Sequence, residues 1–76
     1  MKELVEYIAK SLASFPDDVK VAEEEEDEGH TVVRLEVNPE DKGKIIGRQG
    51  RVAQAMRVLL RVAAVKDGTR VSLEIV

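Results

Sequence analysis

Residues 43–51 read GKIIGRQGR, and the spacing of their glycines is the first constraint on the fold. Gly47 can adopt the positive φ that ends a helix, and Gly50 leaves room for another backbone to approach closely. A helix that begins after Gly50 points its amide N–H groups and partial positive charge at the same place. The segment also carries two arginines and a glutamine, which supply charge and hydrogen-bond donors. It is therefore suited to bind a sugar-phosphate backbone.

Two better-known phosphate loops do not fit this spacing. A P-loop has Lys and then Ser or Thr after its last glycine, whereas Gly50 is followed by Arg51 and Val52. A dinucleotide-binding fingerprint requires G-x-G-x-x-G between a strand and a helix, whereas these glycines are spaced four and three apart after a predicted helix. A helix-turn-helix corner that needs glycine for geometry only is the remaining alternative to a phosphate site.

The rest of the chain predicts short helices and alternating strands. Asn38 is a good N-cap and Pro39 suits the first turn of a short helix that Gly47 ends. The predicted order is α-β-β-α-α-β. Besides that short helix, helices are expected at 2–14 and 51–65, and strands at 19–25, 31–37 and 71–75. Six consecutive acidic residues at 23–28 are predicted to form a loop or a frayed strand end, because such a run repels itself.

The predicted helix 51–65 has an unusually wide apolar face, which covers an arc of about 200°. Such a face is either a protein–protein surface, for a homodimer or a partner domain, or a helix buried by both the sheet and the first helix. Arg57 and Arg61 lie outside the apolar arc. They either extend a basic face or are simply solvated.

Composition limits the chain to one small domain and excludes several kinds of site. The 76 residues include no cysteine and one histidine, so disulfides, zinc-thiolate centres, iron–sulfur clusters and His-rich metal sites are not expected. No paired acid and base or nucleophile–base set can be identified, so we expect no enzyme and no cofactor. No apolar run approaches the roughly 18 residues that span a bilayer, and the first residues lack a signal-peptide pattern. We therefore expect a cytoplasmic protein.

The net charge of −3 is unevenly distributed. Residues 1–41 hold four Lys or Arg against thirteen Asp or Glu, a net of −9, whereas residues 42–76 hold eight against two, a net of +6. Either the basic half forms one local anion-binding face, or the two halves attract each other in the fold.

Segment 43–51 resembles the signature of the KH domain, a small RNA-binding module whose G-x-x-G loop clamps about four nucleotides of backbone. The predicted order is similar to the type II form, an α+β fold with a three-stranded sheet and helices packed on one face. A free-standing domain of this length resembles the KhpA family of small bacterial RNA-binding proteins. The resemblance covers 1–76 as one domain, with a minimal motif at about 31–76 and an N-terminal extension at 1–30.

The resemblance also implies a role for individual residues. Arg48 and Gln49 are the variable pair that contacts phosphates, while basic residues flank the loop and three apolar residues help to form a groove wall. The implied RNA-binding residues are Lys44, Ile46, Gly47, Arg48, Gln49, Gly50, Arg51, Val52 and Met56. The hairpin loop at 23–30 corresponds to the family's variable loop, and its acidity here disfavours tight, general RNA binding.

The implied partners are single-stranded RNA and a second protein, either another copy of this chain or a larger KH-containing protein. The implied role is post-transcriptional, as an RNA chaperone or regulator, with no membrane and no small-molecule substrate. Only two aromatic residues occur, Tyr7 and Phe15, so binding by aromatic stacking platforms is excluded. The alternative is a dimerising or partner-docking module in which RNA binding is weak.

Overall fold

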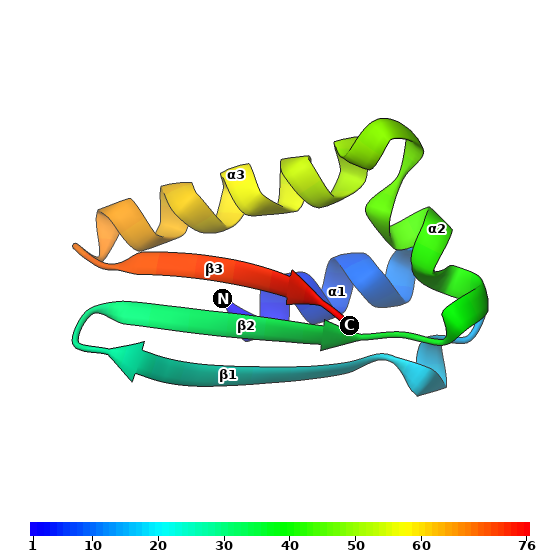
Figure 1. Cartoon of the computed structure of the whole chain (residues 1–76), viewed down its shortest axis with the longest axis horizontal. Coiled ribbons are helices and arrows are strands. Elements are labelled where there is room, and N and C mark those ends of the chain that lie inside the picture. Colours follow the sequence, from blue (N-terminus) through cyan, green and yellow to red (C-terminus); the bar gives the residue numbers. More distant parts are fainter.

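The elements follow the predicted order in the computed structural model, which describes residues 1–76 (Figure 1). The helices are α1 (Lys2–Leu12), α2 (Lys42–Ile46) and α3 (Arg51–Lys66), and the strands are β1 (Lys20–Asp27), β2 (His30–Glu36) and β3 (Arg70–Ile75). Three short 3-10 helices occupy Pro16–Asp18, Pro39–Asp41 and Arg48–Gly50. None of the helices is long and apolar enough to span a membrane.

The three strands form one mixed sheet in the order β1-β2-β3. β1 pairs with β2 in antiparallel register through Val21 and Leu35, and β2 pairs with β3 in parallel register through Val33 and Leu73. A parallel pair needs a long crossover connection, and α2 and α3 provide it (Figure 1). The predicted α+β class, with helices against one face of the sheet, is confirmed.

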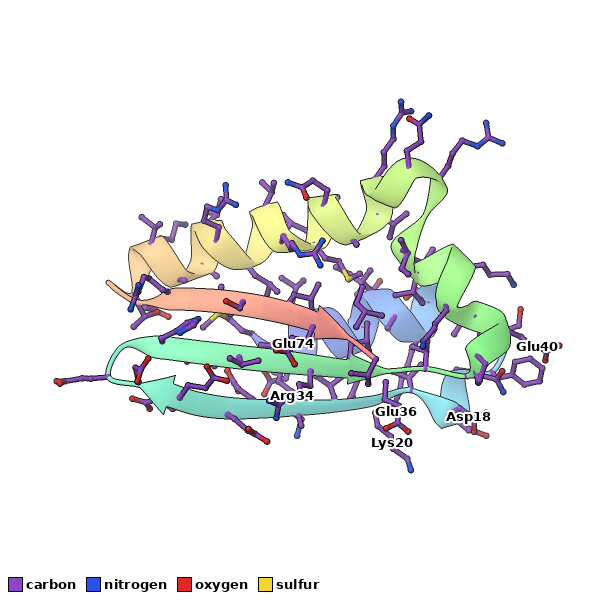
Figure 2. The ribbon with its side chains drawn as sticks, viewed as in Figure 1. Asp18, Lys20, Arg34, Glu36, Glu40 and Glu74 are labelled. Atoms are coloured by element: carbon purple, nitrogen blue, oxygen red, sulfur yellow. The ribbon has the colours of Figure 1, made fainter.

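The core lies between the helices and one face of the sheet. Successive side chains of β2 point to opposite faces of the sheet. Val33 and Leu35 are therefore buried in this core, while Arg34 and Glu36 lie on the opposite face (Figure 2). α1 buries one stripe against the sheet, and α3 buries another. The core residues contributed by the two helices are Val5, Ala9, Met56 and Leu60.

Only one side of α3 is buried. The alternative in which the sheet and α1 bury the whole apolar face of this helix is therefore wrong. Ala53, Met56, Leu60 and Ala64 are buried. An exposed apolar band remains on the other side, where Val62 keeps 52% and Val65 keeps 69% of its surface in solvent. We call this surface the α3 band; its residues are Ala55, Val58, Leu59, Val62 and Val65.

Most of the acidic run is a paired strand, so the prediction of a loop or a frayed strand end at 23–28 holds only for the turn, and β1 extends beyond the predicted end at residue 25. β1 continues to Asp27, and Glu23, Glu24 and Glu25 pair with residues of β2. Only Glu28 and Gly29 form the turn. β1 is an edge strand, so its carboxylates stay in water while its backbone pairs with β2, and that pairing outweighs the repulsion between the charges.

Arg34 joins all three strands on the outer face of the sheet (Figure 2). Its Nη1 lies 2.8 Å from Oε2 of Glu24 on β1, and its Nε donates to Oε2 of Glu74 on β3 at 2.9 Å. The hydrogen bonds to Glu74 and Glu24 raise the pKa of Arg34 above its ordinary value. One cation therefore offsets part of the acidic charge of the sheet.

Asp41 connects the N-terminal extension to α2. Its side chain is almost fully buried, at 1% exposure, and Oδ1 and Oδ2 accept hydrogen bonds from the backbone N–H groups of Ser14 and Phe15, both at 3.0 Å. The Ser14 N–H lowers the pKa of Asp41 most, with burial opposing it, and Phe15 and the charge of Lys44 lower it further. This carboxylate thus satisfies two backbone donors where α1 ends.

We predict that Asp41→Asn lowers the melting temperature at pH 7, because an amide NH₂ would face a backbone donor that the carboxylate now satisfies. The pKa of Asp41 is lowered by folding, so its contribution is present above the ordinary value of 3.8 and is lost as the pH falls through the lowered value. In thermal melts from pH 7 to pH 2, the difference in melting temperature between the wild type and Asp41→Asn should therefore shrink as the pH falls. The exposed Asp17→Asn is the control, and a constant difference at all pH values would contradict the assignment.

Candidate nucleic-acid interface

The corner between α2 and α3 is built from residues with positive φ. α2 ends when Gly47 turns to φ 81° and ψ 168°, after its N–H donates to the carbonyl of Gly43 at 2.8 Å. Gln49 has φ 57° and is the only non-glycine residue with positive φ, and Gly50 has φ 74°. The chain thereby reverses within a few residues, as predicted from the glycine spacing.

Gly47 and Gly50 are needed for different reasons. A Cβ on Gly47 would lie 2.5 Å from Cγ2 and 2.8 Å from the backbone nitrogen of Val52, so no side chain fits there. No atom of the chain lies within 4 Å of a Cβ placed on Gly50. The expected close approach at Gly50 is therefore not made by the protein itself, and the space beside this residue is open to a ligand.

The loop presents positive charge to solvent. Arg48, Gln49 and Arg51 are exposed, and Nη2 of Arg51 donates to Oε1 of Gln49 at 3.1 Å. No side chain caps the N-terminus of α3. The N–H groups of Gly50 and Arg51 already donate to the carbonyls of Gly47 and Arg48. A partial positive charge and two guanidinium groups thus converge at one exposed corner.

The structure does not bring all nine predicted residues to this corner. Ile46 is 39% exposed and Val52 is half-buried beside Gly47, so both are near the loop. Met56 is only 2% exposed and belongs to the core, which corrects the expectation that it helps to form an accessible groove wall. The ammonium group of Lys44 donates to the hydroxyl of Ser14, so it is directed toward the end of α1.

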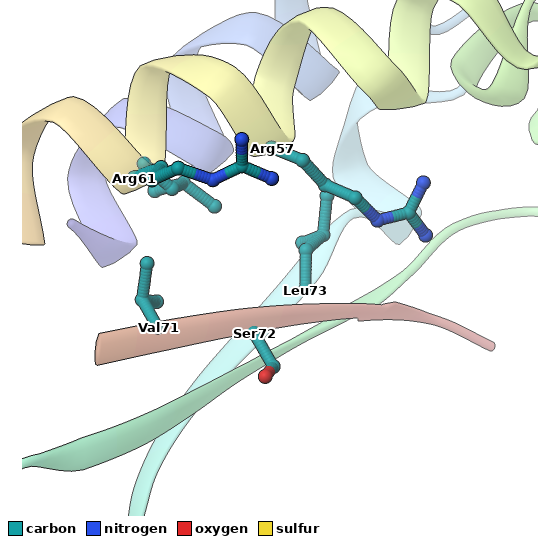
Figure 3. A pocket seen from close by; sticks show the side chains of 6 residues that line it. Arg57, Arg61, Val71, Ser72 and Leu73 are labelled. Carbon is teal, nitrogen blue, oxygen red and sulfur yellow. The ribbon is translucent and has the colours of Figure 1, made fainter.

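A groove that the sequence did not reveal lies between α3 and β3. It has a volume of about 370 Å³, and its lining residues are Arg57, Leu60, Arg61, Val71, Ser72 and Leu73. Figure 3 shows Arg57 and Arg61 extending from α3, Val71 and Leu73 pointing from β3 toward the helix, and Ser72 pointing away. The i, i+4 spacing of the arginines puts them on one side of a helix, but only the fold shows that β3 faces that side.

The cations of the basic half form no ion pairs within the chain. All cations that pair with a carboxylate lie in the acidic half: the N-terminal amine, Lys10 and Arg34. None of the eight Lys and Arg residues after position 41 does so. The cations of the basic half are therefore not neutralised by ion pairs with the acidic half, and they remain available to an anionic ligand.

Comparison with known proteins identifies close relatives along the full chain. The family model described as "KhpA/KhpB, KH domain" matches residues 2–75. An RNA-binding protein KhpA of Clostridium perfringens is 50% identical over 76 residues, which is 100% of both chains. Another, of Aquifex aeolicus, is 45% identical over 75 residues, or 99% of this chain and 94% of the relative.

A solved structure shares the fold. It is the crystal structure of Era in complex with MgGDPNP and nucleotides 1506–1542 of 16S ribosomal RNA. The match has a TM-score of 0.56 and 24% sequence identity, and it covers 97% of this chain and 28% of that chain. At this identity the likeness supports the architecture alone.

We predict that Gly47→Ala destabilises the fold far more than Gly50→Ala. The φ and ψ of Gly47 lie in a region of backbone conformation that essentially only glycine adopts, and the Cβ of an alanine there would clash with Val52. The free energy of unfolding should therefore fall by at least about 3 kcal/mol. Gly50 is in the left-handed helical region with open space around it, so alanine there costs about 1 to 2 kcal/mol. Urea unfolding of both variants gives the comparison, and equal losses would contradict it.

Proposed function

The chain belongs to the KhpA/KhpB family of KH domains, and from this premise we propose that it binds single-stranded RNA without catalysing a reaction. The proposal treats 1–76 as a single KH domain, in which the minimal motif occupies about 31–76 and the extension 1–30. The observation that carries the proposal is the exposed corner at Gly47–Gly50, where two unpaired arginines flank an uncapped helix N-terminus.

The phosphates are proposed to bind at this corner. Because the N–H groups of Gly50 and Arg51 donate within the chain, we assign the phosphate contacts to the N–H groups of Arg48 and Gln49. The guanidinium groups of Arg48 and Arg51 add charge-assisted contacts, which are stronger than neutral ones. The open space beside Gly50 allows the sugar-phosphate chain to pass close to the backbone.

The bases are proposed to lie along the groove between α3 and β3. Ile46 and Val52 supply apolar surface near the loop, and the groove continues past Arg57 toward Arg61. Met56 supports this surface from the core instead of contacting a base. A strand of RNA would thus cross from the loop onto the groove.

The acidic strand is compatible with this path because it lies at the other edge of the sheet. β2 and β3 separate β1 from α3, and neighbouring strands are about 4.8 Å apart, so β1 is about 10 Å from β3. That separation exceeds the Debye length of about 8 Å at physiological ionic strength. The carboxylates of β1 therefore repel RNA in the groove only weakly.

This site suits a protein that holds RNA and leaves its covalent structure unchanged. We propose that it acts in the cytoplasm after transcription, as an RNA chaperone or regulator, and that it needs no cofactor. The lining of the groove supplies apolar contacts and cations, which bind RNA, but no carboxylate or histidine for acid–base chemistry.

We predict that Arg48→Asp combined with Gln49→Asp leaves the thermal melt nearly unchanged and weakens RNA binding more than about tenfold, or 1.4 kcal/mol. The fold should survive because both side chains are exposed and aspartate tolerates the positive φ at position 49. Fluorescence anisotropy with a short labelled single-stranded RNA of mixed sequence measures the effect. Lys20→Asp with Ala22→Asp makes the same change in net charge on β1 and should bind as the wild type does. Equal binding by both double variants would refute the site.

A second function is favoured by the α3 band. Large apolar side chains at Val58, Leu59, Val62 and Val65 are about half exposed or more, which is unusual for one helix face. We propose that a second copy of this chain covers the band, with the two α3 helices antiparallel so that their macrodipoles oppose each other. Two linked RNA sites would then raise the effective concentration of each for one RNA.

We predict that light scattering of the wild type gives the mass of a dimer, and that Val62→Glu gives the mass of a monomer. Burial of a carboxylate at the centre of an apolar interface is strongly unfavourable. Gln54→Glu, on the same helix but outside the band, should stay dimeric. A monomeric wild type would rule out the second copy and leave a larger KH-containing protein as the candidate partner.

A further inference from the structure

We propose that the groove between α3 and β3 selects guanine over adenine, and that Arg57 and Arg61 make this selection. The inference rests on the proposed RNA binding and adds a specificity to it. It comes from the chemistry of the groove lining, in which the polar groups of the helix wall are all hydrogen-bond donors.

Both arginines are free to meet a ligand. Neither Arg57 nor Arg61 forms an ion pair or a side-chain hydrogen bond within the chain. Figure 3 shows their guanidinium groups on the open side between α3 and β3. No other residue has to be displaced before they bind, so the two planar forks are available at the groove.

The groove side chains offer a base no acceptor. Ser72 points away from the groove, and its hydroxyl is 2.9 Å from Nε2 of His30 on the outer face of the sheet. The carboxylate of Glu74 is bound to Arg34 on that same face. The remaining lining residues, Leu60, Val71 and Leu73, are apolar. The side chains of the groove therefore offer a base hydrogen-bond donors from α3 and hydrocarbon from β3, and the acceptors are limited to backbone carbonyls on the free edge of β3.

A wall of donors distinguishes the two purines. Guanine presents two adjacent acceptors, O6 and N7, and an arginine fork binds both at once. Adenine presents N7 beside its N6 amino group, which is itself a donor and needs an acceptor. Against the fork of Arg57 or Arg61, the amino group of adenine would therefore face a second donor, whereas guanine would satisfy both of its acceptors.

The dimensions and the apolar wall suit a base better than a phosphate. The volume of about 370 Å³ lies in the lower part of the range of about 300–1,000 Å³ that is typical of small-ligand sites. Val71 is half-buried and offers apolar surface to the flat face of a base, from which a phosphate would gain nothing, whereas Leu73 is only 6% exposed and closes the groove from the core side. The phosphates already have a better site at the loop of Gly47–Gly50.

The test compares short RNAs of equal length in which isolated purines are separated by uridines. One has guanines, the second adenines, and the third 7-deazaguanines, which lack the N7 acceptor. The wild type should bind the guanine RNA about fivefold or more tightly than the adenine RNA. The 7-deazaguanine RNA should lose most of that advantage.

The decisive variant is Arg57→Lys with Arg61→Lys, which keeps both charges but removes the planar forks. It should bind guanine and adenine RNAs equally, near the wild-type affinity for adenine RNA. Arg70→Lys, on β3 but outside the groove lining, should keep the guanine preference. Thermal melts confirm that the exposed substitutions preserve the fold.

Other outcomes overturn the inference. Equal wild-type affinity for the guanine and adenine RNAs refutes the selection, and so does a lysine variant that retains the preference. A loss of affinity in the lysine variant that is the same for every RNA would show that the arginines contact the sugar-phosphate backbone and not the base edges. In these cases the Arg48→Asp, Gln49→Asp variant can still lose binding, and the proposed RNA function stands. If the wild type binds none of the RNAs, both proposals fail.

Discussion

The close contact between Gly47 and Val52 determines how α2 meets α3, and the remainder of the candidate site depends on that angle. The absence of a Cβ lets the end of one helix lie against the first turn of the next, with Val52 atoms where a side chain would otherwise be. The loop from Arg48 to Gly50 is consequently forced outward and exposed. The same angle directs α3 along β3, which creates the groove of Arg57 and Arg61.

Asp41 fixes the start of α2, the end of this helix that lies away from Gly47. α2 has only five residues and no capping side chain, so it has little stability of its own. The Asp41 carboxylate fixes its start to the backbone at the end of α1, and Lys44 contacts Ser14 one turn later. The N-terminal extension therefore does more than widen the sheet. It holds the helix from which the loop projects.

Much of this fold could be predicted from local sequence, and the failures have a common physical cause. The glycine spacing predicted the corner, and alternation predicted the strands. The extent of β1 was missed because charge repulsion was judged without the backbone pairing to β2, which keeps Glu23 to Asp27 extended at a solvated edge. The contact of Asp41 with the end of α1 could not be predicted from local sequence, because its partners lie 26 and 27 residues earlier in the chain.

The candidate site was predictable only in part for the same reason. Gly47 and Gly50 act through their own backbone angles, which a sequence motif specifies directly. The side of α3 that carries Met56 is set by where the sheet lies, and periodicity alone could not decide whether Met56 or Leu59 would be exposed. Arg57 and Arg61 become groove residues only because a parallel crossover returns β3 beneath α3. The crossover also separates the charges in space, because it carries the basic half of the chain to the sheet edge opposite β1, where its cations form no ion pairs with carboxylates. A polyanion would then be attracted to one edge and repelled from the other, so the fold orients its approach.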